Sequence, residues 1–245
     1  MRPRDWSRRL EDALTKDLFV LHAQPIVDVA SGETVRHELF LRLAGGETLV
    51  PAGEFVFAAE ELGSIGEIDR WVLSRAISLA AAGHALDLNV SVRSADEQLL
   101  ELIRTGTGEA GVDPGQIVLE LGERQLTAAP EPGARFVRGA HELGCGIALD
   151  GFVQGGRGTV LLRELPIDYV KLGARFVQGL ADDGRRRRKA RNAAAKAHAN
   201  GQRVIAQGIE DLITLQLLQD LGVDEAQGYA LARPEPVESL LRRRG

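Results

Sequence analysis

The sequence predicts an α/β fold, a TIM-type (β/α)₈ barrel whose first strand is antiparallel to the others. Short apolar segments recur roughly every 20 to 35 residues, with helix-like stretches between them, as alternating strands and helices require. Six of these segments carry a polar or charged residue at or near their end, and the active sites of such barrels lie at the carboxyl ends of the strands. The chain has 245 residues, where about 250 are typical of this barrel. We therefore expect a single barrel domain over residues 1–245, with an N-terminal helix over 1–17.

The first elements along the chain are a helix and a β-hairpin. Residues 5–17 read as a short amphipathic helix, which leads into a first strand, LFVLHAQPIVDV. The turn SGE connects it to a second strand, TVRHELFLRL, and strands joined by a tight turn are antiparallel. Helical periodicity follows in IDRWVLSRAISLAAAG, PGARFVRGAHELG and DLITLQLLQDLG. Glycines, the usual helix terminators, end several of the predicted helices: Gly83, Gly144, Gly201 and Gly222.

A helix expected over residues 185–200, RRRRKARNAAAKAHAN, has an unusual composition. It offers the barrel mainly alanines, namely Ala190, Ala193, Ala194 and Ala197. Alanine favours helix but buries little apolar area, so this helix should be held weakly. Its surface is either a place where a partner docks or simply a frayed region. The basic run RRRRKAR at its start reads most simply as a solvated loop and helix start.

Composition excludes several classes of function. The net charge of −5 gives no general case for binding a nucleic-acid polymer, and no apolar run approaches the ~20 residues that a membrane span needs. The charged N-terminus lacks the apolar centre of a signal peptide. The single cysteine, Cys145, rules out an internal disulfide and fits a reducing compartment, so we expect a cytoplasmic protein.

Four strand-end residues form the candidate metal site: Glu38, Asn89, Glu120 and Asp150. Taken alone, a carboxylate after a strand is more often a helix cap or a salt-bridge partner. Together, these residues should converge on one mouth of the barrel and offer oxygen ligands. Hard divalent cations such as Mg²⁺ or Mn²⁺ favour such ligands.

These and neighbouring residues lie in motifs that carry a resemblance to a known family. The motifs stand in order along almost the whole chain: QPIVD, HELFLR, LVPAGEF, LNVS, LELGE, ALDGF, LPIDYVKL, AQGIED and DEAQGYALARP. They resemble an EAL domain, the barrel family that hydrolyses or binds the bacterial second messenger cyclic di-GMP. The name-giving tripeptide corresponds to Glu38-Leu39-Phe40.

The resemblance implies a catalytic site that has lost part of its second metal centre. One metal would be held by the four residues of the candidate site. The second metal would use Asp150 together with the positions of Gly151 and Gln207, where active members have carboxylates. Lys171, the candidate general base, and Gln227 are kept. Because a two-metal hydrolase uses both ions to lower the pKa of a bridging water, we expect one Mg²⁺ or Mn²⁺ at most and no efficient hydrolysis.

The loop after Asp150 also departs from the family pattern. In active members it resembles DFGTGYSSL and couples metal binding to dimerisation; here it reads GFVQGGRGTVL, from Gly151 to Leu161. The tip around Gly155 and Gly156 is expected to be flexible and carries one cation. This change leaves open whether the chain forms a homodimer.

The residues that would contact the nucleotide are better kept than the catalytic ones. The resemblance assigns this role to six positions: Gln24, Arg42, Pro51, Phe55, Glu210 and Asp211. Arg42 would pair with a phosphate, Pro51 and Phe55 would lie under a guanine, and the last two would read guanine edges. The alternative for Arg42 is a salt bridge at the barrel rim.

Three functions therefore remain open. The first is an inactive EAL domain that binds cyclic di-GMP as a receptor and signals to a protein partner of unknown identity. The second is an interaction scaffold that no longer binds the nucleotide. The third is a weak phosphodiesterase that uses one metal.

Overall fold

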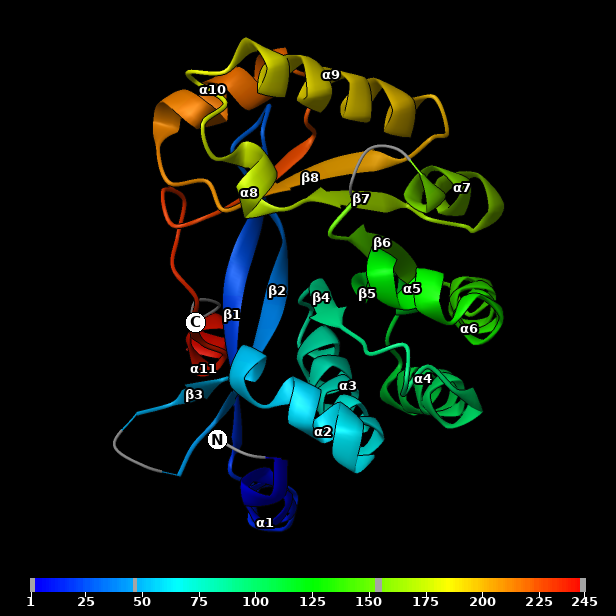
Figure 1. The fold of residues 1–245 in the computed structure, drawn as a ribbon. Coiled ribbons are helices and arrows are strands. Elements are labelled where there is room, and N and C mark those ends of the chain that lie inside the picture. The colour runs from blue at the N-terminus through cyan, green and yellow to red at the C-terminus, as the bar shows by residue number, and fades with distance from the viewer. Residues whose placement is uncertain (1–2, 46–47, 153–155, 243–245) are drawn as a thin grey trace.

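The computed structural model describes residues 3–45, 48–152 and 156–242, so that Gly155, named in the loop above, lies outside the described residues. Eight of the described strands close into a barrel (Figure 1). They are β1 (Phe19–Asp28), β2 (Thr34–Leu43), β4 (Leu86–Asn89), β5 (Ile117–Gly122), β6 (Gly146–Asp150), β7 (Tyr169–Leu172), β8 (Arg203–Gln207) and β9 (Glu225–Gln227). Two short strands flank them, β3 (Val50–Pro51) and β10 (Glu235–Pro236). The predicted TIM-type barrel is confirmed.

The barrel opens with the predicted hairpin. Strand β1 pairs antiparallel with both β2 and β9, whereas β2 and all strands from β4 to β9 follow one another in parallel. The Asp28 carboxylate accepts hydrogen bonds from the backbone of Ala30 and Ser31 and so stabilises the hairpin turn. The first strand is therefore the one antiparallel member of the closed barrel, as the sequence predicts.

Helices surround the strands (Figure 1). They are α1 (Pro3–Thr15), α2 (Val56–Leu62), α3 (Ile65–Ala81), α4 (Glu97–Ala110), α5 (Glu123–Ala128), α6 (Pro130–Glu142), α7 (Arg157–Glu164), α8 (Ala174–Val177), α9 (Gly184–His198), α10 (Leu212–Asp220) and α11 (Glu238–Arg242), with 3₁₀ turns at Ala52–Glu54 and Pro114–Gln116. The first helix ends two residues earlier than predicted, because Asp17 adopts a positive φ of 52° that turns the chain into β1.

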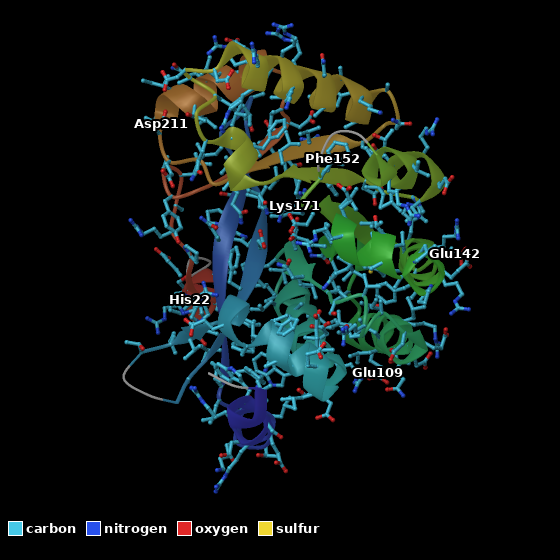
Figure 2. All side chains as sticks on the ribbon, viewed as in Figure 1. His22, Glu109, Glu142, Phe152, Lys171 and Asp211 are labelled. Atoms are coloured by element: carbon cyan, nitrogen blue, oxygen red, sulfur yellow. The ribbon has the colours of Figure 1, made fainter. Side chains whose placement is uncertain are left out.

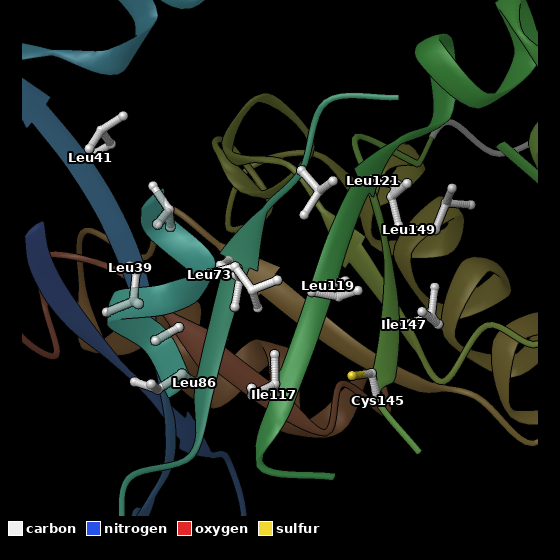
Figure 3. Packing of buried hydrophobic residues seen from close by; sticks show 14 of the residues in the cluster. Leu39, Leu41, Leu73, Leu86, Ile117, Leu119, Leu121, Cys145, Ile147 and Leu149 are labelled. Carbon is white, nitrogen blue, oxygen red and sulfur yellow. The ribbon is translucent and has the colours of Figure 1, made fainter. Parts of the chain in front are cut away.

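The core lies mainly between the strands and the helices. Outward-facing residues of neighbouring strands, such as Leu86, Ile117, Leu119 and Ile147, form one buried cluster with the helices (Figure 3). Because side chains alternate along a strand, the residues between them point into the barrel. In β5 this places Glu120 inside, between outward-facing Leu119 and Leu121. The alternation thus fixes which polar residues enter the barrel.

None of the helices in the described ranges is long and apolar enough to cross a membrane.

Candidate functional site

Polar side chains meet at the carboxyl ends of the parallel strands, a region called the mouth below. Glu38, Glu120, Lys171 and Gln227 are buried there, while Asn89 is exposed and Asp150 and Gln207 are half-buried. Strand register brings them together, since Asn89 pairs with Glu120 on the next strand and Gln207 with Gln227. The structure thus gathers the residues of the candidate metal site in one region.

Lys171, labelled in Figure 2, contacts two members of this group. Its Nζ donates to Glu38 Oε2 at 2.7 Å and forms an ion pair with Glu120. Burial by itself lowers the pKa of Lys171, but the carboxylates of Glu120 and Glu38 outweigh burial and raise this pKa above its ordinary value. The lysine is therefore charged, and its ammonium group stands between the two glutamates.

The two remaining members of the candidate metal site lie beside this ion pair. Asn89 Nδ2 donates to Glu38 Oε1 at 3.0 Å, which leaves the Asn89 side-chain oxygen for another partner. Asn89, Glu120 and Asp150 line a cavity of about 300 Å³. Within the described residues, the buried Glu120 Oε2 has no hydrogen-bond partner.

The far wall of this cavity contains polar residues that the sequence did not reveal as site residues. Glu60 Oε1 accepts from Ser91 Oγ at 2.6 Å and from Gln125 Nε2 at 2.9 Å. Asp69 accepts from the backbone N–H of Ser91 at 3.0 Å and from a serine hydroxyl. Burial raises the pKa of Asp69 to about 6. These bonds hold the chain after β4 in place beside Asn89.

An apolar cavity of about 320 Å³ adjoins the mouth and shares Asn89 with it. Leu39, Leu41, Ala52 and Gly53 contribute to its lining. Pro51, which precedes this 3₁₀ turn, is exposed. The turn that follows Pro51 thus borders the cavity, while the ligand contact predicted for Pro51 stays a prediction.

Phe55 corrects part of that expectation. Its ring is fully buried, 5.9 Å between centroids from both Trp6 and Phe19. A side chain with no exposed surface has no face to offer a ligand. Phe55 therefore packs beneath the loop and is not available to a ligand in this conformation.

Arg42 has a guanidinium group that is free of ion pairs within the described part of the chain. Nη1 donates to the Leu41 carbonyl at 3.0 Å, and the group lies 5.6 Å from the centre of the Phe40 ring. Partial burial lowers the pKa of Arg42. The rim salt bridge that was the alternative for Arg42 is not formed among the described residues. A second cation, Arg233, follows strand β9, the strand that carries Gln227. Its guanidinium group lies 4.6 Å from the centre of the Tyr229 ring.

The other expected ligand contacts differ in their availability. Glu210 is exposed. Asp211 caps α10: its Oδ1 accepts from the Thr214 backbone at 2.7 Å and its Oδ2 from the Thr214 hydroxyl at 2.8 Å. Gln24 is buried and donates to the Ala232 carbonyl at 2.8 Å. Asp211 and Gln24 thus have structural partners already, and Glu210 is the one most free to meet a ligand.

The positions expected to hold the second metal carry no carboxylate. Gly151 has a positive φ of 69°, and a Cβ added there would meet nothing within 4 Å. Gln207 is half-buried at the end of β8. Space for a side chain at residue 151 therefore exists, but the backbone conformation favours glycine.

Below the mouth, a buried ion network crosses the barrel. Arg36 Nε donates to Asp87 Oδ1 at 2.7 Å, and its terminal nitrogens donate to both Glu225 oxygens. The guanidinium group lies 4.2 Å from the centre of the Tyr169 ring. The sequence held a signal for this network, because Arg36, Asp87 and Glu225 each stand two residues before a mouth residue and so face the same way.

The oxygen donors at the mouth are of the kind that a divalent ion such as Mg²⁺ prefers. Inside the barrel, four buried carboxylates (Glu38, Asp87, Glu120 and Glu225) face two buried cations, Arg36 and Lys171. Burial, the largest cause, and the nearby Glu38 charge raise the pKa of Glu120. Glu38, Asn89, Glu120 and Asp150 would hold such an ion. In the conformation described, however, Lys171 forms ion pairs with both glutamates. The described residues contain no cluster of three His, Cys, Asp or Glu that could hold a metal.

Comparison with known proteins agrees with this geometry. The EAL domain family matches residues 7–234. The cyclic di-GMP phosphodiesterase PdeB of Shewanella oneidensis is 30% identical over 96% of this chain, and the cyclic di-GMP phosphodiesterase NbdA of Pseudomonas aeruginosa is 30% identical over 94%. The chain spans only 28% and 31% of the lengths of these two relatives.

Solved structures show the same fold. The PaMucR phosphodiesterase in its c-di-GMP complex has a TM-score of 0.87 and 27% identity, covering 95% of this chain and 98% of that one. The FimX EAL domain of Xanthomonas citri in complex with c-di-GMP has a TM-score of 0.89 and 26% identity, covering 96% and 95%. With the family match over most of its length, the chain belongs to the EAL domain family and is related to cyclic di-GMP phosphodiesterases.

Proposed function

We propose that this EAL domain binds cyclic di-GMP as a receptor, does not hydrolyse it efficiently, and signals to a protein partner. The observation that carries the proposal is the composition of the mouth. Three features support ligand binding: Arg42, which has no ion pair within the described residues, the apolar cavity near Pro51 and the exposed Glu210. The carboxylates expected for a second metal are replaced by Gly151 and Gln207.

Charge supports the absence of efficient catalysis. A pair of divalent ions lowers the pKa of a bridging water and stabilises charge on the attacked phosphate. The mouth keeps ligands for one ion, and Lys171 already compensates Glu38 and Glu120. Lys171, still in the position of a general base, donates to both glutamates. Binding of the nucleotide uses Arg42 and the apolar cavity, which need neither ion.

One titration separates the candidate functions. Purified protein is titrated with cyclic di-GMP in a calorimeter, with and without Mg²⁺, and the mixture is then analysed for linear dinucleotide. Binding without product is the expected result. No binding would favour the scaffold, and robust formation of the linear product would make the chain a phosphodiesterase, in line with the activity named for its relatives.

Restoring the missing ligands tests the reason for inactivity. In the double variant Gly151→Asp with Gln207→Glu, Mn²⁺ uptake should rise and slow hydrolysis should appear. Recovery should be partial, because residue 151 has a left-handed backbone conformation that strains any side chain, and small misplacements of catalytic groups cost large factors in rate. Asn is the matched control at residue 151, since Gly151→Asn adds a similar side chain without the charge.

A further inference from the structure

Helix α9 presents a group of exposed cations that the proposed site does not use. Arg185, Arg188, Lys189 and Arg191 are all exposed on its first half, and are called the α9 cationic face below. Figure 2 shows side chains with nitrogen ends projecting outward from this helix, which covers the outside of β7 and β8. The face is therefore open to a partner.

The other two arginines of the same run have structural partners. Arg186 pairs with Asp183 at 3.5 Å and donates to the Gln178 carbonyl, while Arg187 donates to the carbonyls of Leu180 and Ala181. These bonds tie the preceding loop to the start of α9. Within the described ranges, the side chains of Arg188, Lys189 and Arg191 make no hydrogen bond or ion pair. Structure therefore explains two of the six cations in this run, and the side chains of the other four have no such partner among the described residues.

The α9 cationic face destabilises the helix that carries it. The N-terminus of a helix is the positive end of its dipole, so cations are unfavourable there, and the first turn of α9 contains no acidic residue. Arg185 also has Arg188 and Lys189 as like-charged neighbours three and four residues on, which costs further stability. Both the cations near the helix N-terminus and the repulsion between like-charged neighbours disfavour formation of the helix.

Packing against the barrel contributes little to the stability of α9. Its buried residues are four alanines, Ala190, Ala193, Ala194 and Ala197, which bury little apolar area. In natural sequences, residues whose local preferences conflict with the fold are concentrated at functional positions. An anionic partner would turn the repulsion on the face into attraction and stabilise the helix.

Size and charge identify the kind of anion. The face covers seven residues, roughly 10 Å along the helix axis. The chain has a net charge of −5 although residues 185–191 carry six cations, so the remainder has a net charge of −11. Nucleic acid or a membrane surface extends beyond the face and meets this negative remainder, whereas a short acidic segment contacts only the face. None of the large exposed hydrophobic side chains in the described residues lies on α9, so nothing there inserts into a bilayer.

The face is also connected to the mouth through the chain. Strand β7, which carries Lys171, leads into α8, and α8 packs closely on the residue that follows β8: a Cβ on Gly208 would come within 2.4 Å of Ala174 Cβ. The loop after α8 is the one that Arg186 and Arg187 bind. A ligand that moves the ends of β7 and β8 would thus move the start of α9.

We propose that the α9 cationic face docks a short, Asp- or Glu-rich segment of a partner protein. The proposal gives the chemistry of the partner in the proposed function and rests on that function only for the existence of a protein partner. Binding of the acidic segment stabilises α9 and weakens as salt concentration rises, because exposed charges are screened.

The test uses the whole chain and a fluorescent glutamate-rich peptide. Wild-type protein should bind this peptide, and should not bind the same peptide with glutamine in place of glutamate. The double variant Arg188→Gln with Arg191→Gln should bind about tenfold more weakly, as expected for loss of two exposed charge contacts. Hydrogen exchange of the amides in α9 should slow when the peptide binds.

A matched double variant, Arg163→Gln with Arg242→Gln, removes two exposed cations elsewhere and should bind the peptide like wild type. Equal loss in both double variants, no binding of the peptide, or tighter binding of oligothymidylate or of phosphatidylserine-containing vesicles would overturn the proposal. Cyclic di-GMP titration of the same proteins separates the two ideas. If the protein binds the peptide but not cyclic di-GMP, only the receptor function is rejected. If it binds cyclic di-GMP but not the peptide, only the docking face is rejected.

Discussion

At the scale of single residues, the mouth is organised by charge compensation around Lys171. A buried lysine is expensive unless paired, and here Glu38 and Glu120 pair with it. The same ion pairs hold the side chains of Glu38 and Glu120, two of the candidate metal ligands, on either side of the Lys171 ammonium group. The ion pairs of Lys171 thus offset part of the cost of burying the carboxylates of Glu38 and Glu120 inside the barrel.

Arg42 should supply most of the electrostatic contribution to nucleotide binding. Replacing it, Arg42→Ala, removes a charge-assisted hydrogen bond worth about 1.5–3 kcal/mol, so the dissociation constant for cyclic di-GMP should rise roughly ten- to a hundredfold. Calorimetric titration measures the change. The control Arg104→Ala removes an exposed arginine from α4 and should leave affinity as it is. An unchanged dissociation constant in the Arg42 variant would place the nucleotide elsewhere.

Asp69 should make stability depend on pH. Its pKa is raised from 3.8 to about 6 in the folded protein, so between these values the folded state holds a proton that the unfolded state has released. The free energy of unfolding therefore falls as pH rises through this window, by up to about 1.4 kcal/mol per pH unit.

Urea unfolding at several pH values tests this. Asp69→Asn removes the titration while keeping an oxygen acceptor for Ser91 and Ser94, so the slope between pH 4 and 6 should become flatter. Glu67→Gln, on the exposed side of the same helix, is the control. Identical slopes in wild type and the Asp69 variant would show that Asp69 titrates normally.

At the scale of elements, α9 shows how far composition alone describes a helix. The sequence predicts its position, its alanine face and its terminating glycine, and all three are observed: the four alanines are buried and Gly201 has a positive φ of 79°. Its N-cap, Asp183, accepts from the backbone of Arg185 and Arg186. The cap offsets part of the cost of the cations that follow.

Reversing one charge in α9 should stabilise the protein. Arg185→Glu places an anion at the positive end of the helix dipole and creates favourable pairs with Arg188 and Lys189. Together these should raise the free energy of unfolding by about 0.5–1 kcal/mol, measured by urea unfolding. The same reversal in the last turn of α7, Arg163→Glu, opposes the dipole and should not stabilise. Destabilisation by Arg185→Glu would contradict the account of α9.

At the scale of the whole molecule, the ion network of Arg36 links distant parts of the barrel. Arg36 lies on β2, Asp87 on β4 and Glu225 on β9, so the network reaches across the antiparallel strand β1 to strands on both of its sides. Arg203, half-exposed, pairs with Glu225 at 3.1 Å from outside the network. A buried charge cluster beneath the mouth thus joins the strands on the two sides of β1.

Removing the central cation should strongly destabilise the fold. Arg36→Met leaves Asp87 and Glu225 buried without their main partner, and breaking a buried pair in this way costs about 3–5 kcal/mol. Arg203→Met, which removes a half-exposed partner of the same glutamate, should cost much less. Urea unfolding compares the two variants. Similar small losses in both would mean that water or a bound cation compensates the carboxylates.

The sequence by itself determined the barrel, its antiparallel first strand and the residues gathered at the mouth. It did so because periodicity, turns and strand-end residues are local properties, and because alternation fixes which side chains point inward. The ion network of Arg36 could also be predicted in part, since Arg36 stands two residues before Glu38 and therefore points to the same side of the strand.

Only the tertiary structure decided which of these residues are available to a ligand. Phe55 is buried against Trp6 and Phe19, Asp211 caps a helix, and Lys171 is paired with two glutamates. Each outcome depends on groups that are distant in sequence or on a competition between partners for the same atoms. Local patterns specify where a side chain points, but its partners are chosen by packing and electrostatics across the closed barrel.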